Sequence, residues 1–184
     1  MTRIDPLRES SDELGQKILD AAAAIQPAPP NNLFGTLAHH PQLARRTLQL
    51  GSVFLTEGRL PPRVREIAIL RTAWKTGAEY EWGQHRLLGR QVGLTDEEIT
   101  DLMTPALVGP WTDLERHVAF AVDELCDDGV IDEDTWVKLV EDEAAWKEPE
   151  LVELTLLVGY YRMLAGLMAT SEIELDPGVP SWTD

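Results

Sequence analysis

The chain has 184 residues, of which 43% are hydrophobic, so it is long enough and apolar enough for one domain with a packed core. Its 16 basic and 32 acidic residues give a formal net charge of −16, which disfavours binding to nucleic-acid phosphates and to anionic membrane surfaces. The single cysteine, Cys126, excludes an intramolecular disulfide and a CxxC redox pair.

Helix signals recur along the chain, and no stretch alternates apolar and polar residues as a strand would. Capping residues, prolines and glycines give the expected boundaries. The first expected helix follows the capping box at 10–13 and ends near residue 26. The others cover about 42–58, 63–75, 79–93, the segments that follow Thr95, Thr112 and Asp132, and 150–170. The stretch QPAPPNN at 26–32 is expected to be a loop. The sequence therefore predicts a single all-α domain over 1–184 with about seven or eight helices.

Two stretches of the sequence bear on whether the protein is secreted or spans a membrane. The N-terminal stretch MTRIDPLRESSDELGQ has no apolar run of the kind found in signal peptides. The most hydrophobic stretch, 151–169, reaches membrane-spanning length but contains Glu153 and Arg162, which favours a buried core helix. These features predict a cytoplasmic protein without a membrane partner.

The stretch GAEYEWGQH at 77–85 carries the residues best suited to chemistry. Glu81 and His85 are four residues apart, so a helix places them one turn apart on the same face. The preceding helix ends at Gly77, and so short a connection makes the two helices antiparallel neighbours. Glu66 and His85 lie at similar distances from this turn. The hairpin is therefore expected to bring Glu66, Glu81 and His85 together.

Two carboxylates and an imidazole in a partly apolar pocket form a plausible proton-transfer set. Histidine titrates near neutral pH, and a nearby carboxylate raises its pKa and fixes its tautomer. Crowded carboxylates also shift each other's pKa values, so that one acts as an acid and the other as a base. Tyr80 and Trp82 flank these residues and are expected to shape a pocket for a planar substrate.

Three other interpretations use the same residues. Glu66 lies on an apolar helix face and needs a partner, so a structural pair with Arg63 or Arg65 fits as well as a functional acid. A metal ion held by Glu66, Glu81 and His85 is a rival, although the spacing is not HExxH. The simplest alternative is a surface ion pair between Glu81 and His85.

The segment LPPRVREIAILRTAWKTGAEYEWGQHRLLGRQVGLTDEEI, residues 60–99, resembles the core of the carboxymuconolactone decarboxylase / alkylhydroperoxidase D (AhpD-like) family. The preceding stretch, residues 31–59, is similar to the usual lead-in to that core, so the resemblance covers about 30–105. It implies an all-α, AhpD-like fold built around an antiparallel helical hairpin and assembled as a homo-oligomer. The glycine-bearing last helix also favours more than a monomer.

In AhpD-like peroxidases a glutamate precedes a CxxC motif, and a histidine follows four residues after the second cysteine. Glu66 and His85 match that glutamate and that histidine, while Ala78 and Glu81 stand at the two cysteine positions. The resemblance therefore implies the branch of the family without the CxxC motif, for which thiol peroxidase activity is not expected. It implies instead a cofactor-free decarboxylation like that of 4-carboxymuconolactone decarboxylase.

The resulting hypothesis is a cofactor-independent acid–base enzyme, a decarboxylase acting on a small carboxylated or lactone-like substrate. Its expected catalytic residues are Glu66, Glu81 and His85, with Tyr80 and Trp82 as substrate-binding residues and no metal. Isomerisation and dehydration use the same groups and stay open. A non-catalytic helical oligomer or ligand-binding protein that kept the fold is the alternative from another class.

Overall fold

The computed structural model describes residues 2–25, 31–141 and 146–183, and over these residues the chain forms helices and no strands. The all-α prediction is therefore confirmed. The described part contains nine α-helices and one π-helical turn, η1. Their bounds are α1 Glu13–Ile25, α2 Asn32–Leu37, α3 Pro41–Ser52, η1 Val53–Glu57, α4 Pro62–Thr76, α5 Glu79–Gln91, α6 Asp96–Asp101, α7 Asp113–Asp127, α8 Glu133–Glu141 and α9 Glu148–Ser171.

The helix that the sequence pattern did not indicate is α2. It begins at Asn32, the last residue of the Pro/Asn stretch expected to be a loop, so that prediction is wrong at Asn32; residues 26–30 of the stretch lie outside the described part of the chain. The side chain of Asn31 caps α2 by accepting a hydrogen bond from the backbone N–H of Phe34 at 2.9 Å. A helix of six residues is too short to show a hydrophobic period, which is why α2 was missed.

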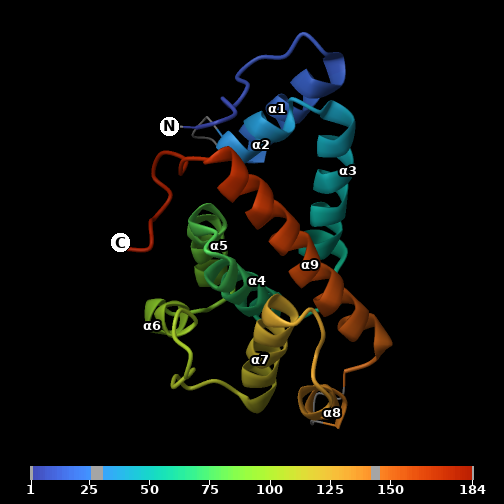
Figure 1. The fold of residues 1–184 in the computed structure, drawn as a ribbon, viewed down its shortest axis with the longest axis vertical. Coiled ribbons are helices and arrows are strands. Elements are labelled where there is room, and N and C mark those ends of the chain that lie inside the picture. Colours follow the sequence, from blue (N-terminus) through green and yellow to red (C-terminus); the bar gives the residue numbers. More distant parts are fainter. Residues whose placement is uncertain (1, 26–30, 142–145, 184) are drawn as a thin grey trace.

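The last helix, α9, runs diagonally along the molecule, with α1, α2 and α3 near one end of the ribbon and α7 and α8 near the other (Figure 1). By length and composition alone it is the one helix in the described residues that is apolar enough to cross a membrane. Half of its most apolar window is buried inside the protein, against α4 and α7 among others. This is the arrangement expected of a core helix.

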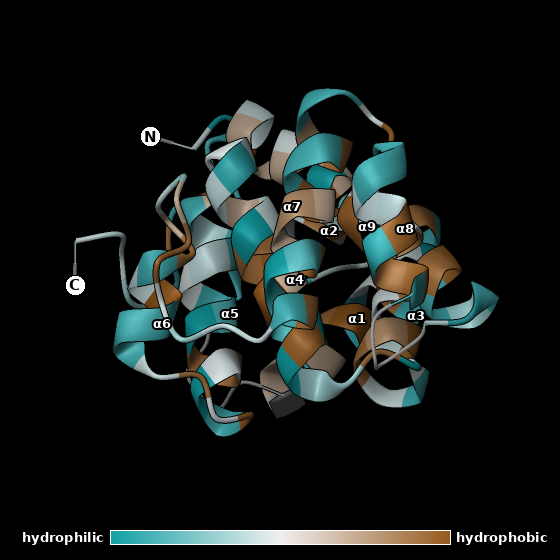
Figure 2. Ribbon diagram, turned by 90° about the horizontal axis from the view of Figure 1, so that it is seen from below, coloured by the Kyte–Doolittle hydropathy of each residue, from teal (hydrophilic) through white to brown (hydrophobic). Residues whose placement is uncertain are grey.

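At the centre of the fold lies α4, which packs against α5, α7 and α9. All residues from 66 to 73 are buried, including Glu66 and Arg71, because neighbouring helices cover several sides of α4. The helices α1, α3, α7 and α8 are more amphipathic, and hydrophobic and hydrophilic residues are interspersed along the ribbon (Figure 2). A polar residue in the middle of α4 therefore has no access to water and must find its partners within the protein.

A tight turn joins α4 to α5 and sets the hairpin. Gly77 ends α4 in the left-handed conformation, with φ of 67°, which glycine adopts without a steric cost. The backbone N–H of Gly77 donates to the carbonyl of Trp74, and that of Ala78 donates to the carbonyl of Ala73. Because α5 starts only two residues later, α4 and α5 pack side by side as the sequence predicts.

Candidate active site

Glu66 lies in the middle of α4, and none of its surface is exposed to solvent. Two basic side chains satisfy its carboxylate. Arg65 Nε lies 3.0 Å from Glu66 Oε1, and His85 Nδ1, on α5, lies 2.7 Å from Glu66 Oε2. Arg63, the other arginine that the sequence offered as a partner, instead binds carboxylates of α6 and α7.

His85 lies between two carboxylates. Its Nδ1 faces Glu66, and its Nε2 lies 3.5 Å from Oε1 of Glu81, one turn earlier on α5. The ring of Tyr161 on α9 packs edge-on against the imidazole, with centroids 5.1 Å apart. Both His85 and Glu81 are 5% exposed, so this is a buried group rather than a surface ion pair. The structure thus brings together the three residues that the hairpin was expected to join.

The electrostatics of the group favour charged forms despite burial. Burial alone would lower the pKa of His85, but the carboxylates of Glu66 and Glu81 outweigh it and raise this pKa to about 9. Burial would likewise raise the pKa of Glu66, but His85 and then Arg65 lower it below its ordinary value. Arg65, Glu66, His85 and Glu81 thus form a row in which basic and acidic side chains alternate, called the charge row below.

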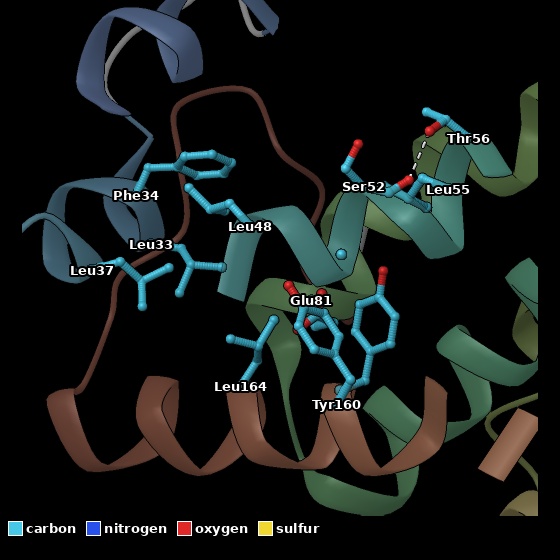
Figure 3. Close-up of a pocket in the computed structure, with 12 residues that line it drawn as sticks. Leu33, Phe34, Leu37, Leu48, Ser52, Leu55, Thr56, Glu81, Tyr160 and Leu164 are labelled. Atoms are coloured by element: carbon cyan, nitrogen blue, oxygen red, sulfur yellow. Dashed lines mark hydrogen bonds between the residues drawn. The ribbon is translucent and has the colours of Figure 1, made fainter. Parts of the chain in front are cut away.

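A cavity of about 390 Å³ opens beside Glu81. Its lining comes from α2, α3, η1, α5 and α9 and consists mainly of leucine and aromatic side chains. In Figure 3 the Glu81 side chain lies between those of Leu164 and Tyr160 on the α9 side, while α3 and η1 lie opposite. Glu81 is the charged residue among the lining side chains. The buried charge row therefore ends at the cavity.

The two oxygens of Glu81 differ. Oε1 faces His85, whereas Oε2 is buried and has no hydrogen-bond partner among the residues that the structure describes. A buried carboxylate oxygen without a donor is unfavourable, and protein interiors rarely leave one. Because Glu81 lines the cavity, a small movement of its side chain would offer this unsatisfied oxygen to a ligand.

Tyr80 and Trp82, expected to wall the pocket, are placed elsewhere and do not line this cavity. The Tyr80 hydroxyl donates to Asp176 Oδ2 at 2.5 Å and so holds the C-terminal tail. Trp82 packs against Trp182 of the same tail, with ring centroids 5.1 Å apart. The aromatic side chains that do line the cavity include Tyr160 and Tyr161.

The C-terminal tail explains why α5 carries Gly83 directly after Trp82. A Cβ atom on Gly83 would lie 2.4 Å from the backbone oxygen of Pro180, so only glycine allows this close approach. Asp176 is 3% exposed and also accepts hydrogen bonds from the Asn32 backbone N–H and from Gln84 Nε2. The tail therefore fastens α2 and α5 together on the side away from His85, a role that the sequence pattern did not indicate.

The described residues contain no group of three or more His, Cys, Asp or Glu side chains arranged to hold a metal ion. Cys126 lies on α7, outside the cavity lining, and burial raises the pKa of its thiol to about 11. A thiol of this kind is a poor nucleophile near neutral pH. The site thus offers carboxylate and imidazole groups for chemistry and no thiolate.

Residues 41–124 match the family model described as "Carboxymuconolactone decarboxylase family". This stretch contains the hairpin with Glu66, Glu81 and His85, so the match supports the family resemblance seen in the sequence. No curated protein matches the chain.

Several solved structures share the fold. A peroxidase-related protein from Silicibacter sp. TM1040 superposes with a TM-score of 0.82 at 14% identity, covering 97% of this chain and 93% of that one. An AhpD-core protein from Ralstonia eutropha JMP134 gives 0.78 at 15% identity, covering 95% and 93%. A cysteine-to-alanine variant of the debrominase Bmp8, in complex with 2,3,4-tribromopyrrole, gives 0.76 at 13% identity, covering 96% and 93%. At these identities the similarity establishes the AhpD-like fold.

Proposed function

We propose that this protein is a cofactor-independent acid–base enzyme in which Glu81 exchanges a proton with a substrate bound in the cavity. One observation carries the proposal: Glu81 lines the cavity and also contacts the buried His85–Glu66 pair. Its Oε2 is the oxygen without a described partner, so it is the atom placed to take up the proton. His85 and Glu66 do not line the cavity, which makes them positioning residues in this account.

The charge row supports such a proton transfer. The imidazolium of His85 faces Glu81 on one side, while Glu66 and Arg65 balance its charge on the other. When a substrate proton moves to Oε2, Glu81 becomes neutral and still accepts from His85 through Oε1. Returning that proton to a different atom of the substrate completes an isomerisation.

The reaction that the family name suggests is a decarboxylation, which requires a substrate carboxylate. Such a substrate would bring a second negative charge beside Glu81, and no lysine or arginine stands among the lining residues to compensate it. We therefore place isomerisation or dehydration, which use the same proton transfer, ahead of decarboxylation for this chain.

The debrominase Bmp8 supports a small ring as the kind of molecule that this fold accommodates, since its structure contains 2,3,4-tribromopyrrole. Thiol peroxidase chemistry is not proposed, because Ala78 and Glu81 stand where the CxxC cysteines would be. The cytoplasmic location expected from the sequence is retained as part of the proposal.

The experiment that tests the proposal measures hydrogen exchange rather than net turnover, so it does not require the natural product to be known. The protein is incubated in D2O with a panel of small cyclic ketones, enones and lactones that carry either a hydroxyl or a carboxyl substituent, and NMR follows loss of the signal of the acidic C–H. We expect catalysed exchange that Glu81→Gln lowers at least about 100-fold. The matched control is Glu97→Gln, the same substitution on an exposed residue of α6. Equal exchange by Glu81→Gln and Glu97→Gln would remove Glu81 from the chemistry.

We also propose a homo-oligomer, as the family resemblance implies. The solvent side of α9 carries Val152, Leu156 and Met163, each more than half exposed. Gly159 lies between them and has no neighbour within 4 Å of the place where a Cβ would stand, so the helix could be approached closely there by a second copy.

A further inference from the structure

We infer that the substrate of this site is an uncharged molecule, about the size of one substituted ring, that presents a hydrogen-bond donor to Oε2 of Glu81. The inference rests on the proposed function and names the class of substrate that the same cavity takes. It follows from the volume of the cavity, from the donors and charges of its lining, and from the unsatisfied carboxylate oxygen of Glu81, a residue that lines it.

The volume of the cavity limits the size of the ligand. An apolar cavity of about 150 Å³ is enough to hold a benzene molecule. The cavity beside Glu81, at about 390 Å³, has room for one ring with substituents and lies near the lower end of the range for small-molecule pockets. A polar chain or a large cofactor would not fit within it.

The lining is poor in hydrogen-bond donors. The hydroxyl of Tyr160 donates to the backbone oxygen of Thr47 at 3.1 Å, and that of Thr56 donates to the backbone oxygen of Ser52 at 2.8 Å. The second of these bonds is drawn in Figure 3. Ser52 and Tyr161 add two neutral hydroxyls, and most of the remaining lining side chains are leucine or phenylalanine. A carboxylate or phosphate on the ligand would therefore meet the Glu81 side chain and a lining without lysine or arginine, so no cation would compensate its desolvation.

The unsatisfied oxygen of Glu81 determines which polar group the ligand should carry. Glu81 Oε2 is buried without a partner in the described part of the protein, so a donor on the ligand restores a hydrogen bond that the free protein lacks. A bond to a charged acceptor is stronger than one between neutral groups. A hydroxyl or ring N–H on the ligand is thus favoured over an ether or carbonyl at the same position, which would bring two acceptors together.

The test compares three probes with the same chlorinated ring: 4-chlorophenol, 4-chloroanisole and 4-chlorobenzoate. Isothermal titration at pH 7 gives the dissociation constant of each for the wild-type protein and for Glu81→Gln. We expect the phenol to bind about tenfold or more tightly than the other two, and Glu81→Gln to remove most of that preference. Benzoate binding as tightly as the phenol, or a preference that Glu81→Gln leaves unchanged, would overturn the inference.

A second variant keeps the test decisive if Glu81→Gln folds poorly. Leu164→Trp leaves the charge row intact and places a larger side chain in the cavity, so it should abolish binding of the phenol. Unchanged phenol binding by Leu164→Trp would place the probe elsewhere and overturn the inference.

The two proposals fail in different ways. If the phenol binds through Glu81 but no panel compound undergoes exchange, the substrate class stands and the enzyme proposal fails. If exchange depends on Glu81 but occurs only with carboxylated compounds, the enzyme proposal stands and the substrate class is wrong.

Discussion

His85 Nδ1 lies 2.7 Å from Oε2 of Glu66 across the packed interface of α4 and α5, and both side chains are buried. A charged hydrogen bond in such surroundings is strong when both partners are present and leaves a costly buried charge when one is removed. The pair therefore links the stability of the hairpin to the protonation of the residue that holds Glu81.

The first prediction concerns stability against pH. The pKa of His85 is raised from 6.5 to about 9 in the folded protein, so the folded state holds this proton more tightly than the unfolded chain. The resulting stabilisation is complete below about pH 6.5 and is lost as the pH rises through about 9. We expect the free energy of unfolding to fall by up to about 3 kcal/mol over this range, measured by urea denaturation. The fall should be much smaller in His85→Gln, and an equal fall in both proteins would contradict the assignment.

The second prediction concerns Glu66→Gln. This substitution removes the anion that lies between Arg65 and His85, and it should destabilise the protein by about 3 kcal/mol or more. The pKa of His85 should fall toward its ordinary value, because Glu66 is the main group that raises it. Thermal unfolding and histidine NMR measure the two effects. If the charge row has only a structural role, Glu66→Gln would lower the melting temperature in the same way but leave any exchange activity at the wild-type rate.

A third prediction separates Tyr80 from Tyr160. Tyr80→Phe removes a donor from Asp176 in the tail, so it should cost about 1–2 kcal/mol of stability and leave probe binding in the cavity intact. Tyr160→Phe changes the cavity lining and should alter the affinity for the ring probes. Urea denaturation and titration of both variants provide the comparison. If Tyr80→Phe lost probe binding and Tyr160→Phe did not, Tyr80 would be a substrate-binding residue, as the sequence predicts.

The fourth prediction concerns self-association. Leu156 is 56% exposed in the middle of the apolar side of α9. Leu156→Glu should convert the proposed oligomer to a monomer, as measured by light scattering after size-exclusion chromatography. Glu148→Gln, at the start of the same helix, is the control. A wild-type protein that is monomeric at micromolar concentration would contradict the proposal.

Much of the fold was predictable because its determinants are local. Thr95 and Thr112 each form the capping box expected from the glutamate three residues later, and Gly77 ends α4 as expected. The helix α2 was missed, since six residues carry too little periodicity. The helix expected over 42–58 corresponds to α3 continued by the π-helical turn η1, and Gly58 ends it in an extended conformation.

The site was predictable to the extent that the hairpin creates it. Glu66, Glu81 and His85 lie on two helices joined by a short turn, so their spacing in sequence determines their proximity. The cavity depends on long-range contacts instead: Tyr160 lies about eighty residues from Glu81 in the sequence, and no local pattern connects them. The same holds for Asp176, whose contact with Tyr80 draws that side chain away from the cavity.

The most direct test of the account is the protonation state of His85 by NMR of the ring nitrogens in protein labelled with nitrogen-15. We predict that both ring nitrogens are protonated at pH 7.5 and that the ring titrates near pH 9, with the pKa lowered in both Glu66→Gln and Glu81→Gln. A neutral imidazole at pH 7.5, with a pKa near 6.5 that neither substitution changes, would contradict the charge row and the proton-transfer site built on it.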